Sequence, residues 1–236
     1  MSVERQPLTL VHTSDLHLGS DLYPEDAMRG FRATLAFARQ RGDVLLIAGD
    51  LLDSERVSSS MVDGVLEDLA GLGMPVVLLP GNHDVALVNG RTPGRLPTNV
   101  HLILREVGAS VDLSEQGLTV WGRPVLDHAP QFRPLEGLPA RPASSWYVVM
   151  AHGMVNPQGL RLFPSSPITA EELSAADCDY IALGHVHVFR DVTQGKVPAF
   201  YSGAPGGMPG RGTVALVALE PQRGATVVPV HLDQVL

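Results

Sequence analysis

Aspartate, histidine and asparagine side chains recur directly after apolar runs along most of this sequence. The residues concerned are Asp15, His17, Asp50, Asp53, Asn82, His83, Asp84, His152, His185 and His187. Carboxylate, amide and imidazole groups together suit Mn, Fe or Zn better than Cu(I), which prefers sulfur. The set contains too much histidine for Mg or Ca alone. Seven of these residues are candidate ligands, too many for one tetrahedral ion, and they suit two ions that share a carboxylate.

Each of these polar groups follows a predicted strand. Apolar runs at residues 8–13, 44–48 and 75–79 alternate with helical patterns at 26–41 and 60–72. The order β-α-β-α-β predicts a parallel sheet with right-handed crossovers. Because the carboxyl ends of parallel strands meet at one edge of a sheet, residues far apart in the sequence can converge there.

The second half of the sequence consists mainly of short strand-like runs, with one helical pattern at 169–174. The runs are 100–104, 110–113, 118–121, 146–151, 179–183, 199–202, 213–219 and 225–232. Together with the first half they predict an α/β fold in which two sheets form a sandwich with helices outside. Gly49, Gly81 and Gly184 precede polar residues at strand ends, where the backbone has to pass close to a ligand.

Composition narrows the class of protein. The single cysteine, Cys178, excludes an intramolecular disulfide and a zinc–thiolate cluster. The sequence lacks a signal-peptide pattern and an apolar run long enough to span a membrane, which predicts a soluble, cytoplasmic protein. A formal net charge of -8 argues against broad electrostatic binding of DNA. The 236 residues suit a single domain over 1–236, with no separate capping domain.

The ordered motifs resemble those of the calcineurin-like metallophosphoesterases. They are Asp15-Leu16-His17, Gly49-Asp50-Leu51-Leu52-Asp53, Gly81-Asn82-His83-Asp84, the lone His152, and Gly184-His185-Val186-His187. The resemblance runs from residue 8 to about residue 203. Within the family, the stretches 11–19 and 179–187 are similar to SbcD-type DNA repair exonucleases. Residues 201–205 (Tyr-Ser-Gly-Ala-Pro) are similar to the Tyr-x-Gly-Ser-Pro run of that branch, with Ala in place of Ser.

The resemblance implies a four-layer α/β/β/α sandwich of two mixed sheets, and two divalent metal ions. Manganese is the first expectation, with iron or zinc as alternatives. One ion would be held by Asp15, His17, Asp50 and His187, and the other by Asp50, Asn82, His152 and His185. Asp50 would then bridge the two ions, and a hydroxide between them would attack phosphorus.

Three further residues would act around the metals. In this scheme His83 stabilises the transition state and protonates the leaving oxygen. Asp53 orients His83 and keeps it cationic, since a neighbouring carboxylate raises the pKa of a histidine. Asp84 holds the loop. His12 is expected to be a packed strand residue, and His101, His128 and His231 are expected to be structural or on the surface.

The expected function is a phosphodiesterase or small nuclease related to DNA repair exonucleases. One alternative is a phosphatase of small phosphomonoesters or nucleotides, and another is an inactive scaffold, which the full set of ligands disfavours. The expected partners are a phosphate-ester substrate, DNA as a candidate, and a partner ATPase by family analogy, with no membrane. Four loop arginines could border the site: Arg91, Arg95, Arg123 and Arg161.

Overall fold

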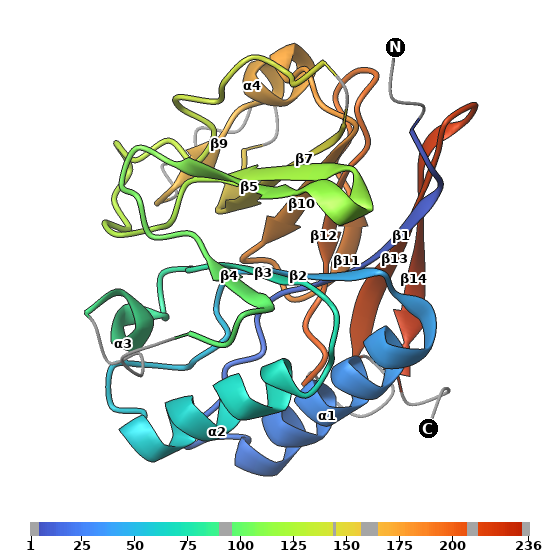
Figure 1. Ribbon diagram of the computed structural model, residues 1–236. Coiled ribbons are helices and arrows are strands. Elements are labelled where there is room, and N and C mark those ends of the chain that lie inside the picture. Colours follow the sequence, from blue (N-terminus) through green and yellow to red (C-terminus); the bar gives the residue numbers. More distant parts are fainter. Residues whose placement is uncertain (1–4, 90–95, 144, 157–164, 207–211, 233–236) are drawn as a thin grey trace.

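The computed structural model describes residues 5–89, 96–143, 145–156, 165–206 and 212–232 (Figure 1). Two six-stranded mixed sheets pack face to face. Helices α1 (Pro24–Arg41) and α2 (Ser59–Ala70) cover the outer face of the first sheet. Helix α4 (Ala170–Ala175) lies on the outer side of the second sheet. This arrangement confirms the predicted four-layer α/β/β/α sandwich of two mixed sheets.

The first sheet has the strand order β14-β13-β1-β2-β3-β4. Its strands are β1 (Leu8–Thr13), β2 (Val44–Ala48), β3 (Val76–Leu79), β4 (Val100–Leu102), β13 (Thr213–Glu220) and β14 (Gly224–His231). Strands β1 to β4 are parallel, as the alternation of strands and helices predicted. Strand β13 runs antiparallel to both β1 and β14, so the end of the chain extends the sheet formed by its beginning.

The second sheet has the order β11-β12-β10-β7-β6-β5. Its strands are β5 (Ala109–Leu113), β6 (Leu118–Gly122), β7 (Trp146–His152), β10 (Tyr180–Gly184), β11 (Phe189–Asp191) and β12 (Ala199–Ser202). The four inner strands are parallel and the two edge strands antiparallel. Smaller elements are α3 (Val85–Val88), a 3-10 turn (Ser114–Gln116), and the paired strands β8 (Met154–Val155) and β9 (Pro167–Ile168).

Apolar side chains fill three layers between these elements. The middle layer, between the sheets, includes Leu10, Leu46 and Val148, each fully buried. The strands of the parallel part are apolar on both faces because each face is covered, one by the partner sheet and one by helices or loops. This two-sided burial explains why the sequence shows continuous apolar runs there rather than alternation.

Local signals set the helix ends, which differ slightly from the expected ones. Helix α1 begins at Pro24 rather than at residue 26, because proline at the first position already has a helical φ. Ser58 caps α2 by accepting a hydrogen bond from the Met61 amide. Thr169 and Glu172 form a reciprocal capping box on α4. Within the described residues, no helix is both long and apolar enough to cross a bilayer.

Candidate metal centre

The loops that follow β1, β2, β3, β7 and β10 bring most of the candidate ligands together. Three groups have nitrogen or oxygen donor atoms within 4.8 Å of one another: Asp15, His17 and His187; His17, Asp50 and His83; and Asp50, His152 and His185. Asp50 and His17 each belong to two groups, so the groups form one continuous cluster. Residues from both sheets meet here, as the placement of polar groups after parallel strands predicted.

The deep side of this cluster consists of His152 with His185 and Asn82, both of which contact His152. His152 is fully buried there, at the end of β7. Its Nδ1 donates a hydrogen bond to the Ala48 carbonyl at 2.9 Å. Its Nε2 faces two candidate ligand oxygens, Asp50 Oδ2 at 3.2 Å and Asn82 Oδ1 at 3.1 Å. A backbone acceptor on one ring nitrogen fixes the tautomer and leaves the other nitrogen for a metal, as is usual for metal-binding histidine.

His17 and His187 form the outer side. Their Nε2 atoms lie 3.3 Å apart, and His187 Nε2 is 3.5 Å from Asp15 Oδ1. Two nitrogens bound to one tetrahedral ion at about 2.0–2.1 Å stand roughly 3.4 Å apart. The spacing therefore fits a shared cation. His17 Nε2 also lies 3.9 Å from Asp50 Oδ2, which connects the outer side to the deep side.

The Asp15 carboxylate is held by groups from both sheets. The Ser14 hydroxyl contacts Asp15 Oδ2 at 2.5 Å, and the Ser202 hydroxyl lies 2.9 Å from Ser14 Oγ. The His185 amide donates to the same carboxylate at 3.1 Å. Ser14 and Ser202 are fully buried. These contacts fix the orientation of Asp15 with Oδ1 directed to His187.

Unusual backbone conformations gather at the same residues. Among the described non-glycine residues, five have positive φ, and four of these are candidate ligands: Asp15 (53°), His17 (47°), Asp50 (54°) and His185 (97°). Positive φ is uncommon for residues with a side chain and is retained where the surrounding structure requires it. The strain is located where side chains from separate strands have to point at one another.

Two glycines make room for this packing. A Cβ atom at Gly49, which has φ of +94°, would lie 2.1 Å from His152 Nδ1. A Cβ atom at Gly81 would lie 2.3 Å from Asp50 Oδ1. Glycine is required at both positions because the backbone touches a candidate ligand, as the sequence pattern indicated.

Asp84 ties the loops after β2 and β3 together. Its buried carboxylate accepts hydrogen bonds from the amides of Leu51, Leu52 and Gly81. Burial, and next the nearby Asp50 carboxylate, raise the pKa of Asp84 to about 7. The structure confirms that Asp84 holds the loop, as predicted.

Charge also couples Asp50 to His152. Burial alone would lower the pKa of His152, but the Asp50 carboxylate outweighs it and raises that pKa to about 9. Burial would likewise raise the pKa of Asp50, but His152 lowers it below the usual range. In the metal-free protein, protonated His152 thus places a positive charge beside Asp50. His152 would release its proton on binding a metal, because a metal-binding imidazole is neutral.

His83 is exposed beside the outer side, and its ring centroid lies 4.8 Å from that of His17. The His83 amide donates to Asp50 Oδ1 at 2.9 Å. Its Nδ1 lies 2.6 Å from the backbone carbonyl oxygen of Asp53. The sequence-based prediction gave this contact to the Asp53 carboxylate, which instead lies 3.4 Å from His17 Nδ1. The turn after β2 points the Asp53 side chain at His17 and its carbonyl at His83, so Asp53 contacts His83 through the main chain.

His128 was expected to be structural or on the surface, and the structure confirms its place on the surface. It is exposed, but its ring makes an edge contact with His185, with centroids 5.3 Å apart. No sequence motif marks it, since it lies in a proline-rich loop. The other three behave as predicted: His12 is buried in β1, His101 is half-buried in β4, and His231 is exposed in β14.

Of the four loop arginines named above, only Arg123 lies within the described residues. Its guanidinium contacts Glu136 Oε2 at 2.6 Å and the carbonyls of Glu106 and Arg133. It also stacks on Phe132, with Cζ 4.7 Å from the ring centroid. These contacts tie Arg123 to its own loop rather than to the metal centre.

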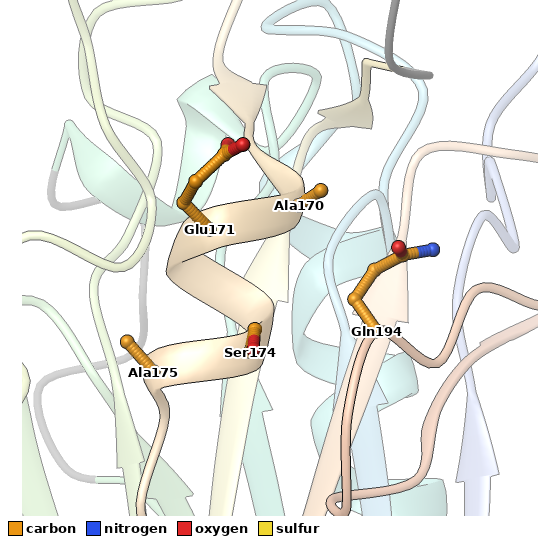
Figure 2. Close-up of a pocket in the computed structure, with 5 residues that line it drawn as sticks. All are labelled: Ala170, Glu171, Ser174, Ala175 and Gln194. Carbon is orange, nitrogen blue, oxygen red and sulfur yellow. The ribbon is translucent and has the colours of Figure 1, made fainter.

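Two hollows on the surface contain none of the candidate ligands. One, of about 380 Å³, lies between α4 and Gln194, and Figure 2 shows Glu171 and Ser174 beside it. The other, of about 710 Å³, runs along α1 near Met28 and Arg32. The cluster of donor atoms, rather than the depth of a hollow, therefore identifies the candidate site.

Comparison with known proteins agrees with the motif resemblance found in the sequence. Residues 8–189 match the sequence model of the family described as calcineurin-like phosphoesterase. Uncharacterized metallophosphoesterase YhaO of Bacillus subtilis (strain 168) is 30% identical over 215 residues, 81% of this chain and 51% of that protein. Probable cyclic nucleotide phosphodiesterase PSM_A2567 of Pseudoalteromonas sp. (strain SM9913) is 30% identical over 106 residues, 42% of this chain and 41% of that protein. The matched part of the chain thus spans about half the length of these relatives, or less.

Solved structures share the fold at low sequence identity. The protein TT1561 of Thermus thermophilus superposes with a TM-score of 0.58 at 12% identity, over 96% of this chain and 100% of that one. A dimetal phosphatase from Danio rerio superposes with a TM-score of 0.56 at 12% identity, over 98% of this chain and 99% of that one. At this identity the likeness concerns the fold alone.

Proposed function

Because the chain belongs to the calcineurin-like phosphoesterase family, we propose that it is a phosphodiesterase that works with two divalent cations. The observation that carries the proposal is the sharing of Asp50 between two groups of potential metal ligands, one with His152 and His185 and one with His17 and His83. A carboxylate common to two ligand groups suits a pair of ions better than a single ion.

The donor set fits such a pair. The outer cation would be held by Asp15, His17, Asp50 and His187, and the deep cation by Asp50, Asn82, His152 and His185. The mixture of imidazole, carboxylate and amide oxygen favours Mn, with Fe or Zn as alternatives. When bound, the cations activate a water for attack at phosphorus and neutralise the phosphate oxygens as charge develops.

His83 is proposed to serve the leaving group. Its Nδ1–H donates to the Asp53 carbonyl, so Nε2 is the nitrogen left for the substrate. The exposed ring stands beside His17 and can reach an ester oxygen above the outer side. From there the imidazolium form of His83 would transfer its Nε2 proton to the departing oxygen as a general acid, leaving neutral imidazole with Nδ1–H still donated to the Asp53 carbonyl.

The open form of the centre favours a diester. Among the described residues, His83 and His128 are exposed and the His187 side chain is 58% exposed, so one side of the cluster faces solvent. An open centre leaves room for both substituents of a diester. A relative that matches part of this chain is named a cyclic nucleotide phosphodiesterase, which agrees with this class. The motif likeness to DNA repair exonucleases makes short DNA a further substrate to test.

The test compares bis-p-nitrophenyl phosphate with p-nitrophenyl phosphate after chelator treatment and addition of Mn, Fe or Zn. We expect hydrolysis only after metal is restored, and a higher kcat/KM for the diester. A higher kcat/KM for the monoester would contradict the proposal and favour a phosphatase of small metabolites. Hydrolysis that survives complete metal removal would contradict the role of the cations.

A further inference from the structure

His128 is an exposed imidazole at the metal centre that, like His83, is outside the proposed ligand set. Its ring meets the edge of His185, one of the deep-side candidate ligands, with centroids 5.3 Å apart and planes inclined at 74°. The His185 ring in turn contacts that of His152, with centroids 5.1 Å apart. His83 makes the corresponding ring contact with His17 on the outer side. One imidazole outside the proposed ligand set thus contacts a candidate ligand of the outer side, and the other contacts a candidate ligand of the deep side.

The loop that carries His128 is tied down on both sides. The Val125 amide donates to the Pro80 carbonyl at 3.1 Å, directly before the loop that carries Asn82. The Ala129 carbonyl accepts from the amides of Ser166 and Phe132, at 3.0 and 3.1 Å. The loop residues in these bonds are Val125, three residues before His128, and Ala129, one residue after it. The ring is thus held at the centre by backbone contacts although its surface is exposed.

The His128 ring borders the candidate ligands without being one of them. His128 is outside the three groups whose donor atoms lie within 4.8 Å of one another. The nearby basic side chains of its loop are engaged elsewhere, Arg123 with Glu136 and Arg133 with the Pro130 carbonyl. Neutral imidazole carries one N–H donor, and phosphate oxygens accept such bonds.

We propose that His128 is a substrate-binding residue that donates an N–H to a phosphate oxygen on the deep side of the centre. This inference rests on the proposed function, because it assumes a phosphate group above the two cations. A contact made both to bound substrate and to the transition state lowers KM more than it raises kcat. His128 would therefore set affinity for the phosphoryl group, whereas His83 would set the rate of its transfer.

The experiment measures binding of inorganic phosphate to Mn-loaded protein by isothermal titration calorimetry, together with metal content and the kinetics of diester hydrolysis. The variants are His128→Ala, His128→Phe and His128→Gln, with His231→Ala as a matched control on β14. A hydrogen bond to a charged group corresponds to roughly a 10–100-fold change in affinity. We expect His128→Ala and His128→Phe to weaken phosphate binding by that factor and to raise KM similarly.

The three variants separate the donor role from a packing role. Phenylalanine keeps a ring against His185 but has no N–H, whereas glutamine keeps an N–H without the ring. We expect partial recovery in His128→Gln, full metal content in all variants, and unchanged binding in His231→Ala. Recovery in His128→Phe, loss of a metal ion in His128→Ala, or unchanged phosphate affinity in His128→Ala would each overturn the inference.

Failure of the proposed function gives a different result. A wild-type protein that binds metal and phosphate but hydrolyses neither ester would contradict the proposed phosphodiesterase. The phosphate affinities of the His128 variants would still decide the inference. Conversely, an active wild-type enzyme whose His128→Ala variant has unchanged phosphate affinity and unchanged KM would retain the proposed function and lose only this inference.

Discussion

The deep and outer sides of the metal centre are built differently. On the deep side, His152 is fully buried, and its Nδ1 is fixed by the Ala48 carbonyl. On the outer side, the His187 side chain is 58% exposed. A ligand whose ring is already oriented loses less freedom when a metal binds. We therefore expect the deep side to hold its cation more tightly, and the outer cation to exchange first.

The largest effect is expected where the two sides meet. Asp50→Asn removes the carboxylate charge that both sides share, so both cations should be lost and hydrolysis should fall to background. Inductively coupled plasma mass spectrometry of the dialysed variant measures the metal content, and a diester assay measures the activity. Retention of one full equivalent of metal would show that Asp50 serves one side only.

The next largest effect concerns His83, which is outside the proposed ligand set although its ring lies near His17 and Asp50. His83→Ala should keep both cations and lower kcat by about 10²–10⁴-fold, the usual contribution of a general acid. Metal content and kcat measured on the same sample check this. An empty outer site in this variant would show that His83 is a ligand.

Paired substitutions compare the two sides directly. His152→Ala should lose the deep cation and also destabilise the metal-free fold by about 3 kcal/mol, because Asp50 would be left buried without its partner. His187→Ala should lose the outer cation and change the free energy of unfolding by less than about 0.5 kcal/mol, because its side chain is largely exposed. Urea denaturation and metal analysis measure both effects.

Equal losses of unfolding free energy in His152→Ala and His187→Ala would contradict the proposal that the deep side is more rigidly built than the outer side. A second check is stepwise chelation of the wild-type protein, followed by metal analysis. We expect the outer cation to leave first, so that His187→Ala loses the fast phase of metal release and keeps the slow one.

The sequence predicted the gathering of the candidate ligands because a general rule of topology applies to them. Side chains that follow the parallel strands of one sheet meet at one edge, which places Asp15 near Asp50 on the first sheet and His152 near His185 on the second. Face-to-face packing of the two sheets then brings these two edges together. The glycines at 49 and 81 were recognisable for a similar reason, since a polar group directly after glycine at a strand end indicates a tight approach.

Features that depend on loop geometry were not predictable. The direction of the Asp53 side chain follows from the turn after β2, which residue types alone do not fix. His128 reaches the centre because the Pro80 and Ala129 carbonyls anchor its loop, and both contacts join segments distant in sequence. Strand β11 is short, and its side chains are at most half-buried, so it lacks an apolar run.

Two fully buried histidines show how strongly the surroundings of a ring control its charge. The carboxylate of Asp50 raises the pKa of His152 to about 9. His12, also fully buried, lies between the sheets with its Nδ1 2.8 Å from the Tyr180 hydroxyl. Burial lowers the pKa of His12 to about 3. The same degree of burial thus favours the charged ring at one position and the neutral ring at the other.

A last prediction, outside the metal centre, follows from His12. Its folded-state pKa is below the unfolded value of 6.5, so its contribution to stability is present above pH 6.5 and is lost as the pH falls. Between pH 7.5 and pH 5.0 this loss amounts to about 2 kcal/mol, at 1.36 kcal/mol per pH unit below 6.5. His12→Gln cannot titrate and should lose correspondingly less stability over that range. Urea denaturation of the metal-free protein at the two pH values measures this, with His231→Gln as an exposed control. Parallel losses in wild type and His12→Gln would mean that the ring becomes protonated without cost in the folded state.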